Sequence, residues 1–245
     1  MKRKKVSMME IEGEYTELAE SCWKFSCFTR SEHIQHTKIT ECDKFLVTIK
    51  NYKSQAIANS DEFAANSLFH IQCMINASRS SLLMWVKIKE GKFNDAWSDL
   101  VDAQEYVSIA LKVLDNEGVR NTEDKLNCFE KTVFPGWALF NSPGFIETVG
   151  ECSICGQSFI QCDHIENNVY MGALCRRVNR KIIEINHVSL VKQPRDKRCV
   201  ITQISDDDGN MIDYFTWEKT GKKNTNEDGM KLEGITYSLK DLDVS

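Results

Sequence analysis

The sequence predicts an α+β protein, in which a helical N-terminal domain is followed by a zinc-knuckle and small antiparallel β C-terminal domain. Three observations predict this class. The first 134 residues contain no proline, and their apolar residues recur mostly with helical spacing. Beyond about residue 181, apolar and polar residues alternate, as in strands with one buried face. Between these regions, four potential metal ligands fall within thirteen residues.

The N-terminal region contains several helical patterns. The segment "NSDEF" (59–63) offers an N-cap at Ser60 or Asp61, followed by acidic residues that suit the positive end of a helix. Gly91 is of the residue type that commonly follows a helix C-terminus. The predicted helices cover about 11–29, about 39–58, the segment from this N-cap to Gly91, about 90–104, and a short stretch after Thr122 that ends before Pro135.

The stretch 135–150 changes character, with two Pro-Gly turn signals and several aromatic residues. We interpret it as a linker between a helical domain, 1–134, and a zinc-binding and β-rich domain, 151–245. The predicted strands are 181–192, 198–205, 211–220 and 230–239. A hairpin turn is predicted at 206–210 and an exposed loop at 219–229.

Composition limits the class of protein. The chain is 42% hydrophobic and 27% charged, as in ordinary globular domains, and its net charge of −5 argues against a molecule that binds polyanions over its whole surface. The basic N-terminus has no apolar segment after it, and the longest apolar stretch, "LLMWVKI" (82–88), is too short to span a bilayer. Ten cysteines without a secretion signal favour a reducing compartment. We therefore expect a cytoplasmic protein with no membrane segment.

The segment "ECSICGQSFIQCDHI" (151–165) is typical of a zinc site. Cys152 and Cys155 have the two-residue gap that lets both thiolates face one ion across a tight turn, and Gly156 can take the positive φ that this turn needs. Cys162 and His164 alternate, so their side chains point to the same side of an extended segment. These four residues would complete a closed, structural zinc site. Cys175 is an alternative ligand that could replace Cys162 or His164.

Residues 152–181 resemble the treble-clef module of HNH nucleases, although no family is recognised over the whole chain. The residues that carry this resemblance are, in order, Cys152, Cys155, Gly156, Asp163, His164, Ile165, Leu174, Cys175, Asn179 and Arg180 or Lys181. The resemblance implies that His164 is the base that deprotonates water and that Asp163 helps to hold a divalent ion. Val178 stands where the family has the second cysteine of its second knuckle, which favours a ligand role for His164.

A basic stretch follows the cysteine-rich segment. Its residues Arg176, Arg177, Arg180 and Lys181 could contact the phosphates of a nucleic acid. A solvated basic edge is the alternative interpretation. Taken together, the sequence favours a zinc-stabilised binding or scaffold protein that recognises a protein or nucleic-acid partner, or a subunit of a larger assembly. The alternative is an HNH-like, metal-dependent nuclease that uses Asp163 and His164.

Overall fold

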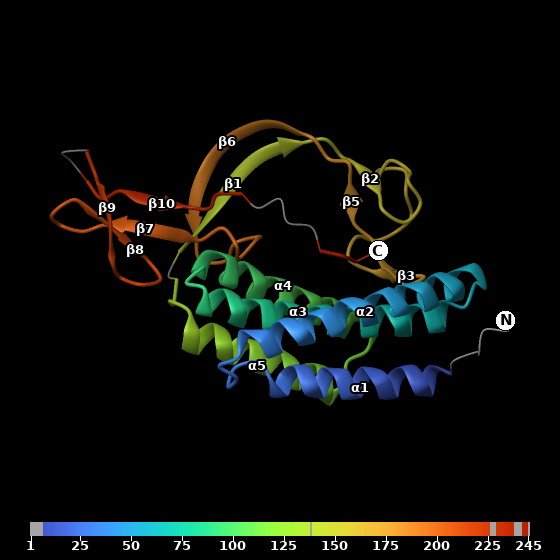
Figure 1. Ribbon diagram of the computed structural model, residues 1–245. Coiled ribbons are helices and arrows are strands. Elements are labelled where there is room, and N and C mark those ends of the chain that lie inside the picture. Colours follow the sequence, from blue (N-terminus) through green and yellow to red (C-terminus); the bar gives the residue numbers. More distant parts are fainter. Residues whose placement is uncertain (1–6, 138, 226–228, 238–241, 245) are drawn as a thin grey trace. The chain divides into compact units, whose positions relative to one another are not determined.

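The computed structural model describes residues 7–137, 139–225, 229–237 and 242–244 (Figure 1). The predicted α+β class is confirmed, because the helices precede a set of antiparallel strands. The described helices are α1 (Met8–Lys24), α2 (Glu32–Ala58), α3 (Glu62–Lys89), α4 (Phe93–Val113) and α5 (Glu117–Val133). The described strands are β1 (Phe140–Glu147), β2 (Glu151–Cys152), β3 (Val169–Tyr170), β4 (Ala173–Leu174), β5 (Arg177–Val178), β6 (Ile182–Val191), β7 (Ile201–Ser205), β8 (Asn210–Asp213), β9 (Lys219–Lys223) and β10 (Leu232–Gly234).

The chain forms two compact units. The first contains the chain up to Asn127, the segment Glu151–Val178 and the C-terminal residues from Leu242. The second contains Cys128–Gly150 and Asn179–Asp241. These boundaries differ from the predicted ones. The cysteine-rich segment groups with the helices because it packs on them, and the predicted linker contains β1.

The helix ends follow capping chemistry. The Asp61 side chain accepts a hydrogen bond of 3.0 Å from the Ala64 N–H, which makes it the predicted N-cap of α3. The helix α2 begins seven residues before its predicted start, because the Ser31 hydroxyl accepts from the Ile34 N–H and caps it there. Gly91 lies just beyond α3 with φ +71°, in the left-handed region that glycine tolerates.

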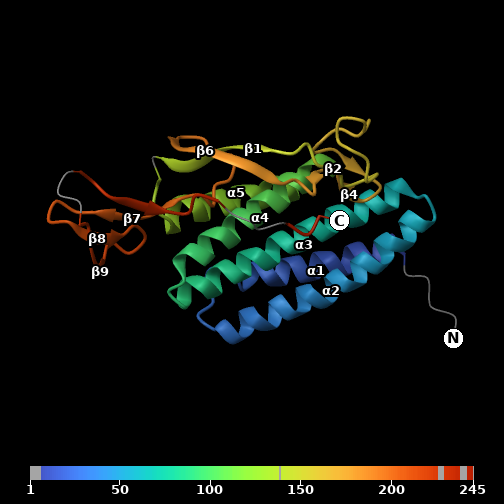
Figure 2. The same ribbon diagram turned by 90° about the horizontal axis from the view of Figure 1, so that it is seen from above.

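Helix α3 is the centre of the first unit. It lies between α2 and α4, as the two views in Figures 1 and 2 show. Its side chains are buried on nearly all sides, with Phe69, Ile75 and Leu82 fully enclosed. A helix that is buried on nearly all sides belongs to the interior of a core. Within the described residues, no helix combines the length and the apolar character that crossing a bilayer requires.

The second unit is built from antiparallel strands. Strands β1 and β6 form a two-stranded ribbon, and β10, β7, β8 and β9 form a four-stranded sheet in that order. The predicted strand 211–220 is interrupted, because the Asp213 carboxylate accepts from the N–H groups of Phe215 and Thr216 and holds a turn there. The chain then re-enters the sheet as β9, in place of the predicted loop from 219. Residues 226–228 and 238–239, which belong to the predicted loop and the last predicted strand, lie outside the described residues.

Candidate metal centre

The cysteine-rich segment begins with a tight turn. The Gly156 N–H donates to the Cys152 carbonyl oxygen at 2.8 Å, and the Cys152 N–H donates to the Gln157 carbonyl oxygen at 2.8 Å. Gly156 has φ +71°, as the sequence predicts, and a side chain would strain this conformation. The turn brings the Cys152 and Cys155 side chains to the same side of the backbone, as a zinc knuckle requires.

Four potential ligand atoms converge in front of this turn. They come from Cys152, Cys155, Cys162 and His164, and all lie within 4.8 Å of one another. The Cys155 and Cys162 sulfur atoms are 3.5 Å apart, and the Cys162 sulfur is 3.2 Å from His164 Nδ1. The group of four that the sequence predicts is therefore brought together in space, and it could hold a metal ion.

The spacing of these atoms fits a tetrahedral ion. Sulfur and nitrogen ligands at about 2.3 and 2.0 Å from zinc lie roughly 3.5–3.8 Å from one another. The shortest separations in the cluster, 3.2 and 3.5 Å, are close to that range, and the largest is 4.8 Å. Movements of about 1 Å or less would therefore complete the tetrahedron. All four donors come from one short segment, so the protein itself would fill all four coordination positions of the ion.

The cluster also stabilises a thiolate. Burial alone raises the pKa of Cys152, but the backbone N–H groups of Cys155 and Ile154 and the neighbouring thiols of Cys162 and Cys175 donate hydrogen bonds that lower it to about 6. The Ile154 N–H lies 3.4 Å from the Cys152 sulfur. These hydrogen bonds therefore favour the thiolate form of Cys152, which is the form that binds a soft metal.

Cys175, the alternative ligand, lies beside the cluster but is not part of the group of four. Its sulfur is 3.7 Å from the Cys152 sulfur, and its side chain is fully buried. Burial, together with the adjacent Cys152 thiolate, raises the pKa of Cys175 to about 12. Cys175 therefore remains a thiol near pH 7, and its S–H can donate to the Cys152 sulfur.

The position of His164 bears on the resemblance to HNH nucleases. Its Nδ1 atom lies 3.2 Å from the Cys162 sulfur, and its ring forms a T-shaped pair with the Tyr170 ring, with centroids 4.7 Å apart. Asp163, which lies between Cys162 and His164 in sequence, is exposed and is not a member of the group of four potential ligands. The structure thus includes His164, but not Asp163, in the group that could hold a metal ion.

The cysteine-rich segment is anchored to the helices by a contact that sequence analysis did not identify. Strands β3 and β4 form a hairpin whose turn residues Met171 and Gly172 both have positive φ, as in a type I′ turn. The Gly172 N–H donates to Asn66 Oδ1 at 2.8 Å, and its carbonyl oxygen accepts from Lys53 Nζ at 2.9 Å. One feature of the sequence could have indicated that Lys53 is buried. It lies four residues after Ile49 and therefore on the same buried face of α2.

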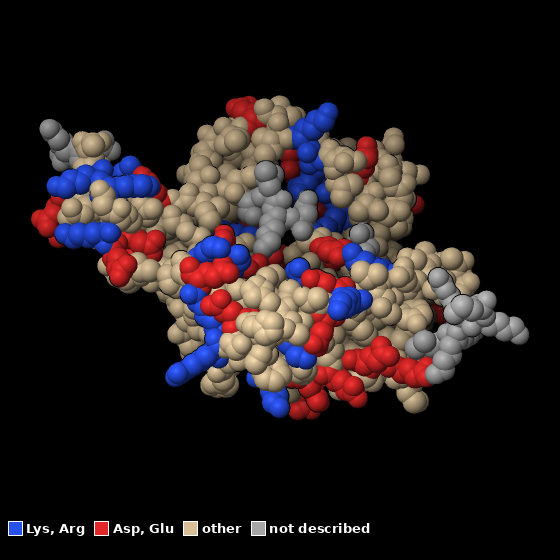
Figure 3. Space-filling view, viewed as in Figure 1, with Lys and Arg blue, Asp and Glu red and all other residues tan. Residues whose placement is uncertain are grey.

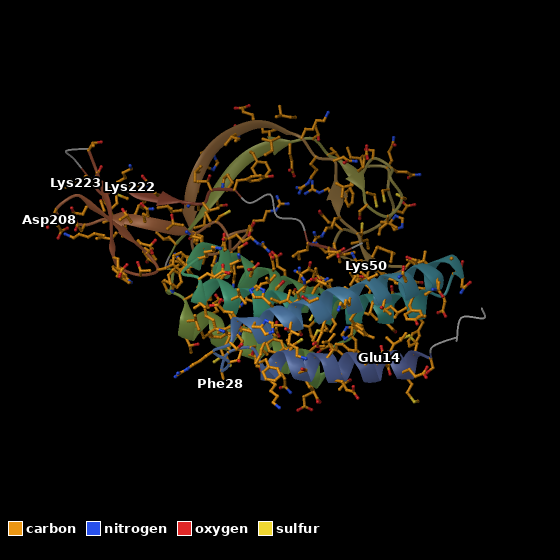
Figure 4. The ribbon with its side chains drawn as sticks, viewed as in Figure 1. Glu14, Phe28, Lys50, Asp208, Lys222 and Lys223 are labelled. Atoms are coloured by element: carbon orange, nitrogen blue, oxygen red, sulfur yellow. The ribbon has the colours of Figure 1, made fainter. Side chains whose placement is uncertain are left out.

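The C-terminal residues add a second anchor to the same region. The Leu174 N–H donates to the Val244 carbonyl oxygen at 3.2 Å, and the Asp243 N–H donates to Tyr106 Oη at 3.0 Å. The Asp243 carboxylate pairs with Lys50 of α2, which Figure 4 labels. Residues 242–244 thus connect the hairpin to α2 and α4.

The predicted nucleic-acid residues are divided between the two units. Arg176 and Arg177 belong to the first unit, and Arg180 and Lys181 belong to the second. Arg177 pairs with Glu166 at 3.2 Å, and Arg180 donates to both carboxylate oxygens of Glu147 at 2.9 and 3.0 Å. Two of the four residues that were predicted to contact phosphates are thus already paired with glutamates of the chain.

Comparisons with known proteins do not add to this description. The chain matches no family model, no curated protein and no solved structure.

Proposed function

We propose that the cluster of Cys152, Cys155, Cys162 and His164 holds zinc, and that the chain is a zinc-stabilised binding protein for a protein or nucleic-acid partner. The observation that carries this proposal is the convergence of three thiols and one imidazole within 4.8 Å. Thiolate and imidazole are the ligands that zinc prefers, and four protein ligands leave no position for a substrate. Such a site supplies stability and not catalysis.

The small size of the surrounding module supports a structural role for zinc. Strands β2, β3, β4 and β5 have only two residues each. Within residues 151–178, all of which the structure describes, only Cys152, Gly172, Leu174 and Cys175 are buried, so this segment has no apolar core of useful size of its own. Segments of this kind usually need a metal or cross-links to stay ordered. Zinc would hold the module in shape, and Lys53 and Asn66 would hold it on the helices.

A partner surface is supported by the exposed apolar side chains of the β1–β6 ribbon. Ile183 is 66% exposed and Ile185 is 64% exposed, and Val188 and Leu190 are also exposed on the same strand. Contiguous exposed apolar side chains are typical of surfaces that contact another macromolecule. This feature favours a binding protein or a subunit of an assembly.

Removal of the metal tests the proposal. Zinc-loaded and chelator-treated protein are compared by hydrogen exchange and by far-ultraviolet circular dichroism. We expect exchange to rise in residues 151–178, while the helical signal remains, because α1 to α4 have their own core. Equal exchange in the two samples would contradict the structural role of zinc.

The nuclease alternative has its own test. Plasmid DNA and single-stranded RNA are incubated with the protein in magnesium and in manganese, beside the His164→Ala and Asp163→Asn variants. The proposal predicts no cleavage above that of a buffer control. Cleavage that both substitutions abolish would favour the HNH-like nuclease.

A further inference from the structure

A row of aromatic rings crosses the second unit, away from the cysteine-rich segment in sequence. The Trp137 and Tyr214 rings are stacked, with centroids 6.1 Å apart and planes at 16°. The Tyr214 and Trp217 rings follow, with centroids 5.7 Å apart and planes at 34°. We call these three residues the aromatic row. Its outer member, Trp217, is 68% exposed, although large aromatic residues usually bury most of their surface.

The hairpin between β8 and β9 fixes Trp217 in this exposed position. Its backbone has φ +58°, which is rare for a bulky residue. The Trp217 N–H donates to the Asp213 carbonyl oxygen at 2.9 Å, and the Asp213 N–H donates to the Glu218 carbonyl oxygen at 2.9 Å. The turn thus holds an unfavourable backbone conformation in order to present an indole to solvent. Strained residues of this kind cluster at binding and functional sites.

The inner end of the aromatic row borders a groove of about 510 Å³. Its walls include the rings of Phe134, Trp137 and Phe140, and its lysines are Lys131, Lys192 and Lys197. The Trp137 indole is fixed by a hydrogen bond of 3.0 Å from Nε1 to the Ile201 carbonyl oxygen. The volume is in the range of sites that hold a small organic group.

The groove is positively charged, in contrast to the whole chain with its net charge of −5. Lys197 pairs with Glu130 at 3.0 Å, and these two charges cancel. Lys131 and Lys192 have no acidic partner among the residues that the structure describes. The groove therefore has a net charge of about +2, which favours an anionic ligand.

A further cation lies on β9, the strand that follows Trp217. Lys219 lies 3.9 Å from Asp206, and Lys222 lies 3.6 Å from Glu233, which also pairs with Lys231 at 2.7 Å. Lys223 is exposed and has no acidic partner among the described residues (Figure 4). Basic and acidic side chains are interleaved on this sheet (Figure 3), so charge alone does not define the site.

We propose that the aromatic row and the groove of the second unit bind single-stranded nucleic acid. Trp217 is the exposed ring of the row and can stack on a base, and the unpaired lysines can contact phosphates, which is how proteins hold single strands without reading their sequence. A duplex hides the faces of its bases, and an acidic peptide such as poly-glutamate offers charge without a base to stack on Trp217. This inference names the partner within the proposed binding role, and it uses none of the metal ligands.

The test is fluorescence anisotropy of labelled 20-residue oligo-dT and oligo-U with the full chain. We expect Trp217→Gly to weaken binding about tenfold, since one stacked base contributes roughly 1–3 kcal/mol. Glycine removes the ring and also relieves the positive φ, so the hairpin remains folded. The matched control is Phe28→Ala, which removes another aromatic side chain, 93% exposed and in the first unit. This control should bind like the parent.

Lysine variants test the groove. Lys131→Ala and Lys192→Ala should each weaken binding several-fold and lower the slope of log Kd against log salt by about 0.7. The control is Lys44→Ala, which removes an exposed lysine on α2. It should leave the affinity and the salt slope unchanged. A mononucleotide at millimolar concentration should compete poorly, because it reaches only one part of the surface.

Several results would overturn the inference. They are absence of binding at low salt, equal affinity of the parent and the Trp217→Gly variant, equal affinity for duplex DNA, and tighter binding of poly-glutamate than of the oligonucleotide. The test is independent of the metal. Zinc without oligonucleotide binding would retire this inference alone, and oligonucleotide binding without zinc would retire the zinc proposal alone.

Discussion

The ammonium group of Lys53 donates a hydrogen bond of 2.9 Å to the carbonyl oxygen of Gly172, across 119 residues of sequence. Lys53 is only 3% exposed, and it also donates to Gln72 Oε1 at 2.8 Å and lies over the Phe69 ring. A buried ammonium group is costly unless it is hydrogen-bonded. The contact therefore joins α2, α3 and the β3–β4 hairpin at one point, and it ties the candidate metal centre to the helical core.

Removing this ammonium group should destabilise the protein. In Lys53→Met the Gly172 and Gln72 oxygens lose their donor inside the core, and such a loss costs about 1–3 kcal/mol. Lys50→Met is the matched control, because Lys50 lies on the same helix but is 42% exposed and makes a surface ion pair with Asp243. Surface pairs contribute about 1 kcal/mol or less. Urea denaturation compares the variants, and equal destabilisation would contradict this account.

The stability of the protein should depend on the protonation of Lys53. Burial lowers the pKa of Lys53 from 10.5 to about 8. Between about pH 8 and pH 10.5 the unfolded chain binds more protons than the folded chain at this residue, so its contribution to stability rises with pH. The total is at most about 3 kcal/mol, at 1.36 kcal/mol per pKa unit.

The Lys53→Met variant isolates this contribution, because the cysteines titrate in both proteins. The free energy of unfolding of the parent minus that of the variant should be flat below pH 8 and should increase above it. A difference that falls with pH, or stays constant to pH 10.5, would contradict the assigned pKa shift.

Gly172 should not tolerate alanine. A Cβ atom there would lie 2.8 Å from the Ala65 carbonyl oxygen, and the residue has φ +75°. Gly91 is a matched control, since its φ is +71° and a Cβ atom would meet nothing within 4 Å. Both variants have the backbone strain, but only Gly172→Ala adds the clash. We expect it to lower the melting temperature more than Gly91→Ala does, and equal losses would show that the hairpin does not press on α3.

Cys175→Ser should retain the metal. In this account Cys175 is a thiol that donates to the Cys152 sulfur, and a serine hydroxyl can make the same kind of hydrogen bond. Cys155→Ser, by contrast, should lose it, because a ligand is removed. Metal content after dialysis, measured for both variants, distinguishes the two roles. Loss of metal from the Cys175 variant alone would make Cys175 a ligand in place of one of the four.

The sequence predicts the parts of this protein that local patterns determine. The N-cap at Asp61, the positive φ of Gly156 and the four converging donors all depend on residues close together in the chain. The predicted strand 211–220 is longer than the observed β8, which ends at Asp213. The Asp213 side chain accepts hydrogen bonds from backbone N–H groups that a longer strand would use.

Contacts between residues that are distant in sequence could not be predicted from local sequence patterns. Nothing near Lys53 in sequence indicates that its partner is the Gly172 carbonyl oxygen. The grouping of Glu151–Val178 with the helices could not be predicted for the same reason, because it depends on a contact between the β3–β4 hairpin and helices that are distant in sequence. The apolar stripe of α2 could have suggested that Lys53 is buried, but not what it binds.

The central claim is tested most directly by zinc content in the parent protein and in His164→Ala, purified without chelator and measured by elemental analysis. Cys128→Ser, which removes an exposed cysteine outside the cluster, is the control. We expect about one zinc per chain in the parent and in the control, because closed sites of this kind bind zinc with roughly 10–16 kcal/mol. We expect a marked loss of zinc, with a lower melting temperature, in His164→Ala. A parent protein without zinc, or a His164→Ala variant with full zinc and an unchanged melting temperature, would contradict the account.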